Sequence, residues 1–255
     1  MQEYKNKVIV ISGGLGDIGQ ALALAFLDSG AIVCVGDQFD LSTACEKWAL
    51  LGSSTVNLHY DQVDVTNPNQ VDAWLSNCRE NYGAISICIP NAARVTLKDY
   101  RALGHEEWIA EMDVNLNGSF FMANTCAKYF VEDNISGNIV FLGSWAAHAV
   151  HKNLPAYSVS KAAIRMLCQS MALEYAPYGI RVNEIAPGYV NAGLSKVVWA
   201  ENPDLQEKAM ATVPLRTILE ADEIAQQVLW MCSSYCKHLT GASIVLDGGL
   251  SLIRP

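Results

Sequence analysis

The chain has 255 residues, of which 51% are hydrophobic and 17% are charged, and its formal net charge is −9 at pH 7. This composition is ample for a buried core and excludes an intrinsically disordered chain. The acidic balance, without any cluster of Lys and Arg, argues against nucleic acid as a partner. The sequence contains no run of about 18 apolar residues, so we expect no membrane span.

We expect a cytoplasmic protein, because residues 1–7 are short and polar and contain no apolar core of a secretion signal. In that compartment its eight cysteines are expected to be reduced and mostly buried. They are Cys34, Cys45, Cys78, Cys88, Cys126, Cys168, Cys232 and Cys236. The pattern at 232–238 (Cys, Cys, His) lacks an evident fourth ligand, so we expect a helix end there and no metal.

Short apolar runs alternate with stretches of helical apolar spacing along the whole chain. Strands are predicted at 7–12, 31–35, 55–60, 85–89, 138–142, 180–185 and 243–246, and helices at 17–28, 41–51, 68–82, 106–131, 155–175 and 221–232. This alternation predicts βαβ units and a parallel sheet covered by helices on both faces. We therefore predict an α/β fold, a single Rossmann-type doubly wound domain over residues 1–255. Residues 189–217, which include Pro203 and Pro214, predict an irregular segment that forms a substrate lid.

A glycine-rich turn joins the first predicted strand to the first helix, with Gly13, Gly14, Gly16 and Gly19. Glycines allow a tight turn and a close approach to a pyrophosphate, and the helix start offers free N–H groups. Asp37 follows the second strand at the offset where an acid binds the adenosine ribose. It would repel a 2′-phosphate, and no Lys or Arg just after it would bind one, so the sequence predicts NAD rather than NADP as cofactor.

Tyr157 and Lys161 lie four residues apart in a predicted helix and therefore share one helix face. A cation beside a phenol favours the phenolate, so the pair is suited to acid or base work near neutral pH. By this spacing alone, a surface Tyr and Lys on an ordinary helix would be the more common case. Ser144 before it and the glycine turn favour the catalytic interpretation.

These motifs together resemble the short-chain dehydrogenase/reductase family, in its compact form and over nearly the whole chain. The resemblance rests on Ser12 to Gly19, Asp64-Val65, Pro90-Asn91-Ala92-Ala93, Asn115, Ser144, Tyr157, Lys161, Arg181-Val182-Asn183, Pro187-Gly188 and Asp247-Gly248-Gly249. It implies hydride transfer between a nicotinamide and an alcohol or carbonyl carbon. It also implies a homotetramer.

The resemblance assigns a role to each catalytic residue. Tyr157 is the acid or base, and Ser144 binds the substrate oxygen. Lys161 lowers the Tyr157 pKa and binds the nicotinamide ribose, while Asn115 supports a water that links Lys161 to solvent. Expected cofactor contacts are Gly13, Asp17, Ile18, Gly19, Asp37, Asp64, Val65, Asn91, Ala92, Tyr157, Lys161, Pro187, Gly188 and Val190.

The chain departs from the family's pattern at three places. Asp17 replaces the middle glycine of the first motif, and we expect it to turn outward and cap the first helical turn. Pro90 and Ala93 alter the segment after the fourth strand, where Pro90 has no N–H. Ala192 replaces a threonine that holds the nicotinamide carboxamide, so backbone groups near Val190 are expected to do more.

Candidate substrate residues flank the catalytic segments or lie in the predicted lid: Arg94, Trp145, His148, His151, Asn153, Tyr189 and Trp199. For each histidine a surface-loop position is an equal alternative. The polar mixture favours a sugar, a polyol or a hydroxy acid bound by Arg94, with hydroxysteroids or hydrophobic ketones as the alternative. Two other classes stay open: a nucleotide-sensing regulator, which the complete catalytic set disfavours, and an NADP-dependent thioester reductase, which Asp37 disfavours.

Overall fold

The strands form one parallel sheet. In the computed structural model, which describes residues 3–52, 56–150 and 152–253, seven strands lie in the order β3-β2-β1-β4-β5-β6-β7. Every neighbouring pair is parallel. The strands are β1 (Val8–Ser12), β2 (Ile32–Asp37), β3 (Leu58–Gln62), β4 (Ile85–Ile89), β5 (Asn138–Leu142), β6 (Arg181–Pro187) and β7 (Ser243–Leu246). The predicted doubly wound parallel sheet is confirmed.

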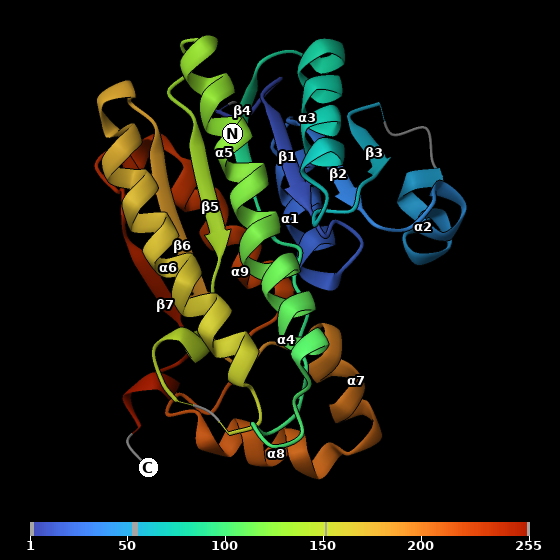
Figure 1. Ribbon diagram of the computed structural model, residues 1–255, viewed down its shortest axis with the longest axis vertical. Coiled ribbons are helices and arrows are strands. Elements are labelled where there is room, and N and C mark those ends of the chain that lie inside the picture. The colour runs from blue at the N-terminus through green and yellow to red at the C-terminus, as the bar shows by residue number, and fades with distance from the viewer. Residues whose placement is uncertain (1–2, 53–55, 151, 254–255) are drawn as a thin grey trace.

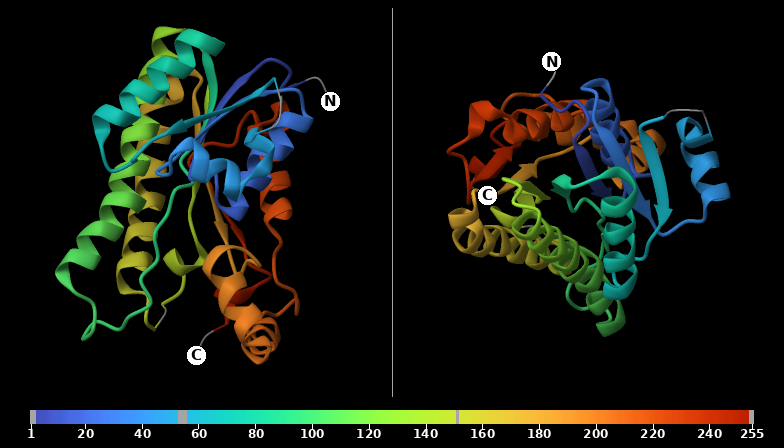
Figure 2. Two further views of the ribbon diagram at one scale, coloured as in Figure 1. Left: turned by 90° about the vertical axis from the view of Figure 1, so that its right-hand side faces the viewer. Right: turned by 90° about the horizontal axis from the view of Figure 1, so that it is seen from above.

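Helices cover both faces of this sheet (Figures 1 and 2). On one face lie α3 (Pro68–Tyr82), α5 (Ser119–Glu132) and α6 (Pro155–Tyr175), and on the other lie α1 (Asp17–Asp28) and α9 (Ala221–Cys232). The short α2 (Leu41–Lys47) lies at the β3 edge, and α4 (His105–Met112) precedes α5. Beyond the carboxyl ends of the strands lie α7 (Gly193–Glu201) and α8 (Pro203–Thr212).

The side chains of β1 show why its sequence is continuously apolar. Successive strand residues point to opposite faces of a sheet. Ile9 and Ile11 belong to the core with α1 and α9, whereas Val8 and Val10 belong to the core with α3, α5 and α6. All four are buried because helices cover both faces.

The order of strands reverses between β1 and β4, which opens a crevice at the carboxyl ends of these two strands. Asn91, after β4, joins the two loops there: its amide donates to the carbonyls of Ser12 and Gly13, both at 3.0 Å. The Ser12 hydroxyl in turn accepts the N–H groups of Asn91 and Ala92 at 3.1 and 3.2 Å. The segment after β4 therefore fixes the shape of the glycine turn.

Arg181, at the start of β6, holds the turn that follows α9. Its guanidinium donates to the carbonyls of Met231, Ser233 and Cys236 at 2.8, 3.2 and 3.0 Å.

Within the described ranges, no group of three or more His, Cys, Asp or Glu is arranged to hold a metal ion. None of the described helices combines the length and apolar character needed to cross a bilayer.

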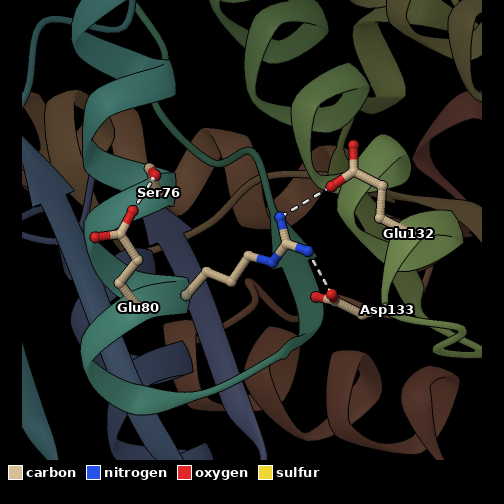
Figure 3. Close-up of polar contacts among 5 residues, drawn as sticks. Ser76, Glu80, Glu132 and Asp133 are labelled. Atoms are coloured by element: carbon tan, nitrogen blue, oxygen red, sulfur yellow. Dashed lines mark hydrogen bonds and ion pairs between the residues drawn. The ribbon is translucent and has the colours of Figure 1, made fainter.

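Arg79 links the end of α3 to the end of α5 (Figure 3). Its guanidinium donates to a carboxylate oxygen of Glu132 at 2.9 Å and also binds Asp133. The same group lies 4.4 Å from the centre of the Tyr129 ring. Along α3 itself, the Ser76 hydroxyl donates to Glu80 at 2.7 Å. The two neighbouring helices are thus joined at the edge of their shared core.

Three helical predictions need correction. The helix expected over 41–51 ends at Lys47, where Trp48 is extended, and a separate 3-10 turn follows. Residues 189–217, expected to be irregular, contain the helices α7 and α8. The helix expected over 106–131 is interrupted by a π-helical turn, Asp113–Gly118, between α4 and α5. Such turns insert one residue into the hydrogen-bond ladder and frequently occur at functional sites, and this one contains Asn115.

Candidate active site

A cavity of about 1270 Å³ opens at the carboxyl ends of the strands. Its lining runs continuously from the glycine turn to α7 and α8. Of the predicted site residues it includes Gly13, Asp17, Ile18, Gly19, Asp37, Asp64, Val65, Asn91, Ala92, Arg94, Ser144, Trp145, Asn153, Tyr157, Gly188, Tyr189, Val190 and Trp199. Asn115, Lys161 and Pro187 are buried and do not belong to this lining. The fold therefore brings motifs from both halves of the chain to one site.

The glycine turn leaves no room for side chains at three positions, one of which is Gly14, where a Cβ would lie 2.5 Å from the Val35 Cβ. Gly13 has a φ of +64°, and a Cβ there would lie 2.7 Å from the Ala92 Cα. A Cβ on Gly19 would lie 2.2 Å from the carbonyl oxygen of Gly13. The start of α1 lines the cavity, and the first N–H groups of a helix have no intrahelical acceptor. A pyrophosphate of a dinucleotide fits this arrangement.

Asp37 ends β2 and lines the same end of the cavity. Its carboxylate accepts the N–H of Leu15 at 3.1 Å and that of Gln38 at 2.8 Å, which holds it beside the glycine turn. A carboxylate at this position of a doubly wound fold reaches the adenosine ribose. Lys47 also lines the cavity, with its ammonium 4.5 Å from the centre of the Phe39 ring. Lys47 lies ten residues after Asp37 along the chain, so the sequence alone did not indicate that it lines this cavity.

Two other predicted cofactor positions, Asp64 and Val65, follow β3 and line the cavity. One oxygen of the Asp64 carboxylate already accepts the N–H and the hydroxyl of Thr66, at 2.9 and 2.8 Å.

Beyond β6, Gly188 is sterically required, because a Cβ there would lie 2.7 Å from the Cα of Asp247. The terminal glycine motif thus packs directly against the loop after β6.

Asp17 does not cap α1, contrary to expectation. The residue at the cap position is Gly16, and no side chain caps the helix there. One Asp17 oxygen accepts the N–H of Gly193 at 2.7 Å, and the other lies 3.7 Å from the Lys196 ammonium. Both partners belong to α7, so Asp17 ties the glycine turn to a helix that lines the cavity.

Ser144 and Tyr157 face the cavity from neighbouring elements. Ser144 follows β5, and its Oγ accepts the N–H of Ala146 at 3.1 Å, which fixes the side chain. Tyr157 lies in the first turn of α6, which begins at Pro155. Burial raises the pKa of the Tyr157 phenol, a hydrogen bond with Ser144 lowers it, and the Glu111 carboxylate raises it further. The phenol therefore holds its proton at neutral pH.

Lys161 lies one turn further along α6 and is 3% exposed. Its Nζ donates to the carbonyl of Leu142 at 2.7 Å and lies 5.6 Å from the centre of the Tyr157 ring. Burial lowers the pKa of Lys161 to about 8, while the carboxylates of Glu184 and Glu111 raise it. Burial is the largest effect on the phenol and raises its pKa, so the lowering of that pKa by Lys161 stays a prediction.

Asn115 joins three parts of the site. Its Oδ1 accepts the Arg94 N–H at 2.7 Å, and its Nδ2 donates to the Arg94 carbonyl at 2.9 Å and to Ser160 Oγ at 3.0 Å. The Ser160 hydroxyl donates to the carbonyl of Tyr157 at 2.8 Å. The side chain therefore holds the loop after β4 against the first turn of α6. Its support of a water next to Lys161 stays a prediction.

Three aromatic residues of the predicted substrate set form one wall of the cavity. The Trp145 and Tyr189 rings meet edge to face with centroids 5.3 Å apart, and Tyr189 meets Trp199 in the same way at 6.4 Å. Arg94 and Asn153 line the cavity too. Lys152, which the sequence did not indicate as a site residue, adds a third cation to the cavity lining, besides Lys47 and Arg94.

The expectation that His148 forms a pocket wall is wrong. Its Nδ1 lies 3.2 Å from a guanidinium nitrogen of Arg165, and its Nε2 lies 3.2 Å from the Ser243 hydroxyl. The ring thus points toward α6 and β7 rather than into the cavity. The other predicted histidine, His151, lies outside the described residues.

Comparison with known proteins agrees with this geometry. The family model described as enoyl-(acyl carrier protein) reductase matches residues 14–251. Glucose 1-dehydrogenase 2 of Bacillus subtilis (strain 168) is 27% identical, over 98% of this chain and 97% of its own. The 3beta-hydroxysteroid dehydrogenase 1 of Eggerthella lenta is 29% identical, over 98% of this chain and 95% of its own. A short-chain type dehydrogenase/reductase structure from Mycobacterium marinum superposes with a TM-score of 0.87 at 30% identity, covering 97% of this chain and 96% of that one. The chain therefore belongs to the short-chain dehydrogenase/reductase family of oxidoreductases.

Proposed function

We propose that this protein is an NAD-dependent oxidoreductase that interconverts a secondary alcohol and a carbonyl on a small polar substrate. One observation carries the proposal: a single cavity runs from the glycine turn and Asp37 to Ser144 and Tyr157. A dinucleotide held by its pyrophosphate at the start of α1 would extend along this cavity. Its reactive end would then lie beside the two hydroxyls.

NAD, when bound, supplies the hydride acceptor, and its reduced form supplies the hydride donor. The protein's own residues hold the substrate oxygen and move its proton. Ser144 and Tyr157 both line the cavity, and Ser144 is close enough to lower the pKa of the phenol, so both hydroxyls would bind the substrate oxygen. The protonated phenol donates to that oxygen during reduction, and the phenolate accepts the proton during oxidation. Lys161 stabilises the phenolate, and Asn115 holds the first turn of α6 in place through Ser160.

Tyr157→Phe tests this assignment. The variant keeps the ring and the packing but has no proton to transfer, so turnover should be abolished while NAD binding stays nearly intact. Tyr235→Phe is a matched control, because this tyrosine is 85% exposed and does not line the cavity. Substantial residual kcat in Tyr157→Phe would refute the acid/base role.

The preference for NAD is argued from charge. A 2′-phosphate on the adenosine ribose would face the Asp37 carboxylate, and like charges at short range are repulsive. Lys47 lines the same end of the cavity and would oppose that repulsion in part. We expect a higher kcat/KM with NAD than with NADP, and a smaller difference in Asp37→Asn. A clear NADP preference in the wild type would overturn this part of the proposal.

The polar lining favours a sugar, a polyol or a hydroxy acid as substrate. Arg94 and Lys152 place two cations in the cavity, and the Trp145, Tyr189 and Trp199 wall offers apolar faces to the carbon skeleton of such a molecule. The same aromatic wall supports the second candidate, a hydroxysteroid, which is the substrate class in the name of one relative. Measuring NAD reduction with aldoses, polyols, hydroxy acids and hydroxysteroids separates the two. Exclusive turnover of steroids would refute the polar-substrate proposal.

We further propose that the protein works as a homotetramer in the cytoplasm. On α6, Val159, Met166 and Leu173 recur every seven residues, and they are 40%, 63% and 82% exposed. A repeated exposed apolar row on one helix face is typical of an interface. Light scattering should give a mass near four chains, whereas a single species of 27.8 kDa would rule the tetramer out.

A further inference from the structure

A buried carboxylate that the mechanism has not used lies behind Lys161. Glu184 of β6 is 0% exposed, and neither of its carboxylate oxygens forms a hydrogen bond of ordinary geometry with any described residue. A buried carboxylate without strong partners destabilises a fold, because it loses its hydration. Its surroundings therefore need an explanation.

The backbone after β5 brings this carboxylate to Lys161. A Cβ on Gly143 would lie only 1.8 Å from Oε1 of Glu184, so the missing side chain at position 143 provides the space that the carboxylate occupies. The preceding residue, Leu142, offers its carbonyl to the Lys161 ammonium at 2.7 Å. Carboxylate and ammonium are thus seated at two successive residues, 142 and 143.

Other polar and titratable groups surround the Glu184–Lys161 pair. They are Tyr157, Arg165 and Cys168 from α6, Ser243 from β7, His148 from the loop after β5, and Glu111 from α4. Ser243 pairs directly with Glu184 across the strands and lies 3.2 Å from His148, which in turn lies 3.2 Å from Arg165. Arg165 is thereby engaged by the histidine, whereas the Lys161 ammonium has a neutral carbonyl as its hydrogen-bond acceptor.

We propose that Glu184 is a positioning residue for the dehydrogenase reaction: its carboxylate keeps Lys161 protonated and seated on the Leu142 carbonyl beside Tyr157. The inference rests on the proposed function, in which Lys161 acts as an ammonium. Burial disfavours the charged form of an amine, and an opposite charge nearby favours it. Without the carboxylate, Lys161 would lose its proton at a lower pH, and the cation beside the phenol would be lost with it.

Direct titration of the Lys161 amine tests the proposal without any substrate. Protein labelled with ¹³C and ¹⁵N at lysine gives a resonance for each amine, and the Lys161 signal is the one missing in Lys161→Met. In the wild type this amine should titrate near 8. In Glu184→Gln the midpoint should fall by about one pH unit. An unchanged midpoint in a folded Glu184→Gln protein would overturn the proposal.

Three further variants make the result specific to this carboxylate. Glu174→Gln removes an exposed acid from α6, the helix that carries Lys161, and should leave the Lys161 midpoint unchanged. Glu184→Asp keeps the charge and should shift the midpoint less than Glu184→Gln does. If thermal melting shows that Glu184→Gln does not fold, Gly143→Ala serves instead, because it displaces the carboxylate without removing its charge. An unchanged midpoint in Gly143→Ala would then count against the proposal.

The pH profile of kcat for alcohol oxidation distinguishes positioning from a merely structural role. In Glu184→Gln the alkaline limb should move to lower pH by the same amount as the Lys161 midpoint. A structural defect would instead lower kcat at every pH without moving the limb, and that result would contradict the proposal. If the wild type shows no turnover with any substrate, the proposed function fails, and the lysine titration still decides whether Glu184 holds Lys161 charged.

Discussion

Replacing Gly19 with alanine should disrupt the turn on which the cofactor site is built. The added Cβ would lie 2.2 Å from the Gly13 carbonyl oxygen and 2.9 Å from the Gly14 Cα. Both are backbone atoms, and the Gly13 carbonyl is further held by the Asn91 amide at 3.0 Å. Neither can rotate away as a side chain would, so α1 itself must move.

The size of the effect follows from this distance. Ordinary contact begins at 3.4 Å, so the Cβ falls 1.2 Å short of it (3.4 less 2.2). Because Leu22 and Phe26 of α1 are fully buried, a shift of that size also loosens the core. Overpacking of this kind costs about 3 kcal/mol at the upper end, and alanine regains about 1 kcal/mol in helix propensity. The net loss is about 2 kcal/mol, or a fall in Tm of roughly 4–8 °C.

Urea unfolding at fixed protein concentration and a titration with NAD measure both consequences. Gly16→Ala is the matched control, because its Cβ would have Gly13 O at 3.6 Å as its nearest neighbour and its φ of −75° suits alanine. We expect this control to lose less than about 1 kcal/mol in unfolding free energy. The steric reasoning is refuted if Gly19→Ala unfolds at the same urea concentration as Gly16→Ala and binds NAD as well as the wild type does.

Three other changes give different outcomes. Asp17→Ala should loosen α7, seen as faster amide hydrogen exchange there, with a change in unfolding free energy of about 1 kcal/mol; unchanged exchange in α7 would contradict the contact. Arg79→Ala should cost about 1 kcal/mol or less in urea unfolding, and less still in 1 M salt (about 3 Å Debye length), because its ion pairs are partly exposed. Burial lowers the pKa of Lys161 from its ordinary 10.5 to about 8 in the folded chain. Between pH 8 and pH 10.5 the unfolded chain therefore binds more protons than the folded chain, so the free energy of unfolding rises with pH in this range. Lys161→Met should lack this rise. If urea unfolding gives the same pH dependence of unfolding free energy in the wild type and in Lys161→Met, the lowered pKa of Lys161 is refuted.

The sheet and the meeting of the motifs could be predicted because both depend on local pattern. The spacing of apolar residues in β5 and α6 identifies each element by itself, and both end at the predicted residues, Leu142 and Tyr175. Once the strands are parallel, the residues that follow them come to one edge. Asp37, Ser144 and Tyr157 were therefore brought into one cavity by the topology itself.

The contacts that the sequence did not predict are those between distant segments. The Asp17 carboxylate binds a backbone group 176 residues away, and His148 contacts Ser243 across 95 residues. The local spacing of apolar and polar residues cannot predict contacts between such distant positions. The helices of the 189–217 segment were missed for another reason. Pro203 was interpreted as a break, whereas it stands in the first turn of α8, where proline is tolerated.

Two departures of this chain from its family's pattern meet at one place in the fold. Asp17 stands where the family has a glycine, and Ala192 stands where the family has a threonine. Ala192 is the cap residue of α7 and has no side-chain acceptor for that helix. The first N–H groups of a helix need acceptors, and the Asp17 carboxylate provides one for Gly193 at 2.7 Å. Its charge would repel a pyrophosphate, but the Lys196 ammonium, 3.7 Å away, offsets that charge. The acceptor for α7 thus comes from the opposite wall of the cavity, so a change at Asp17 should act on α7 and leave α1 in place.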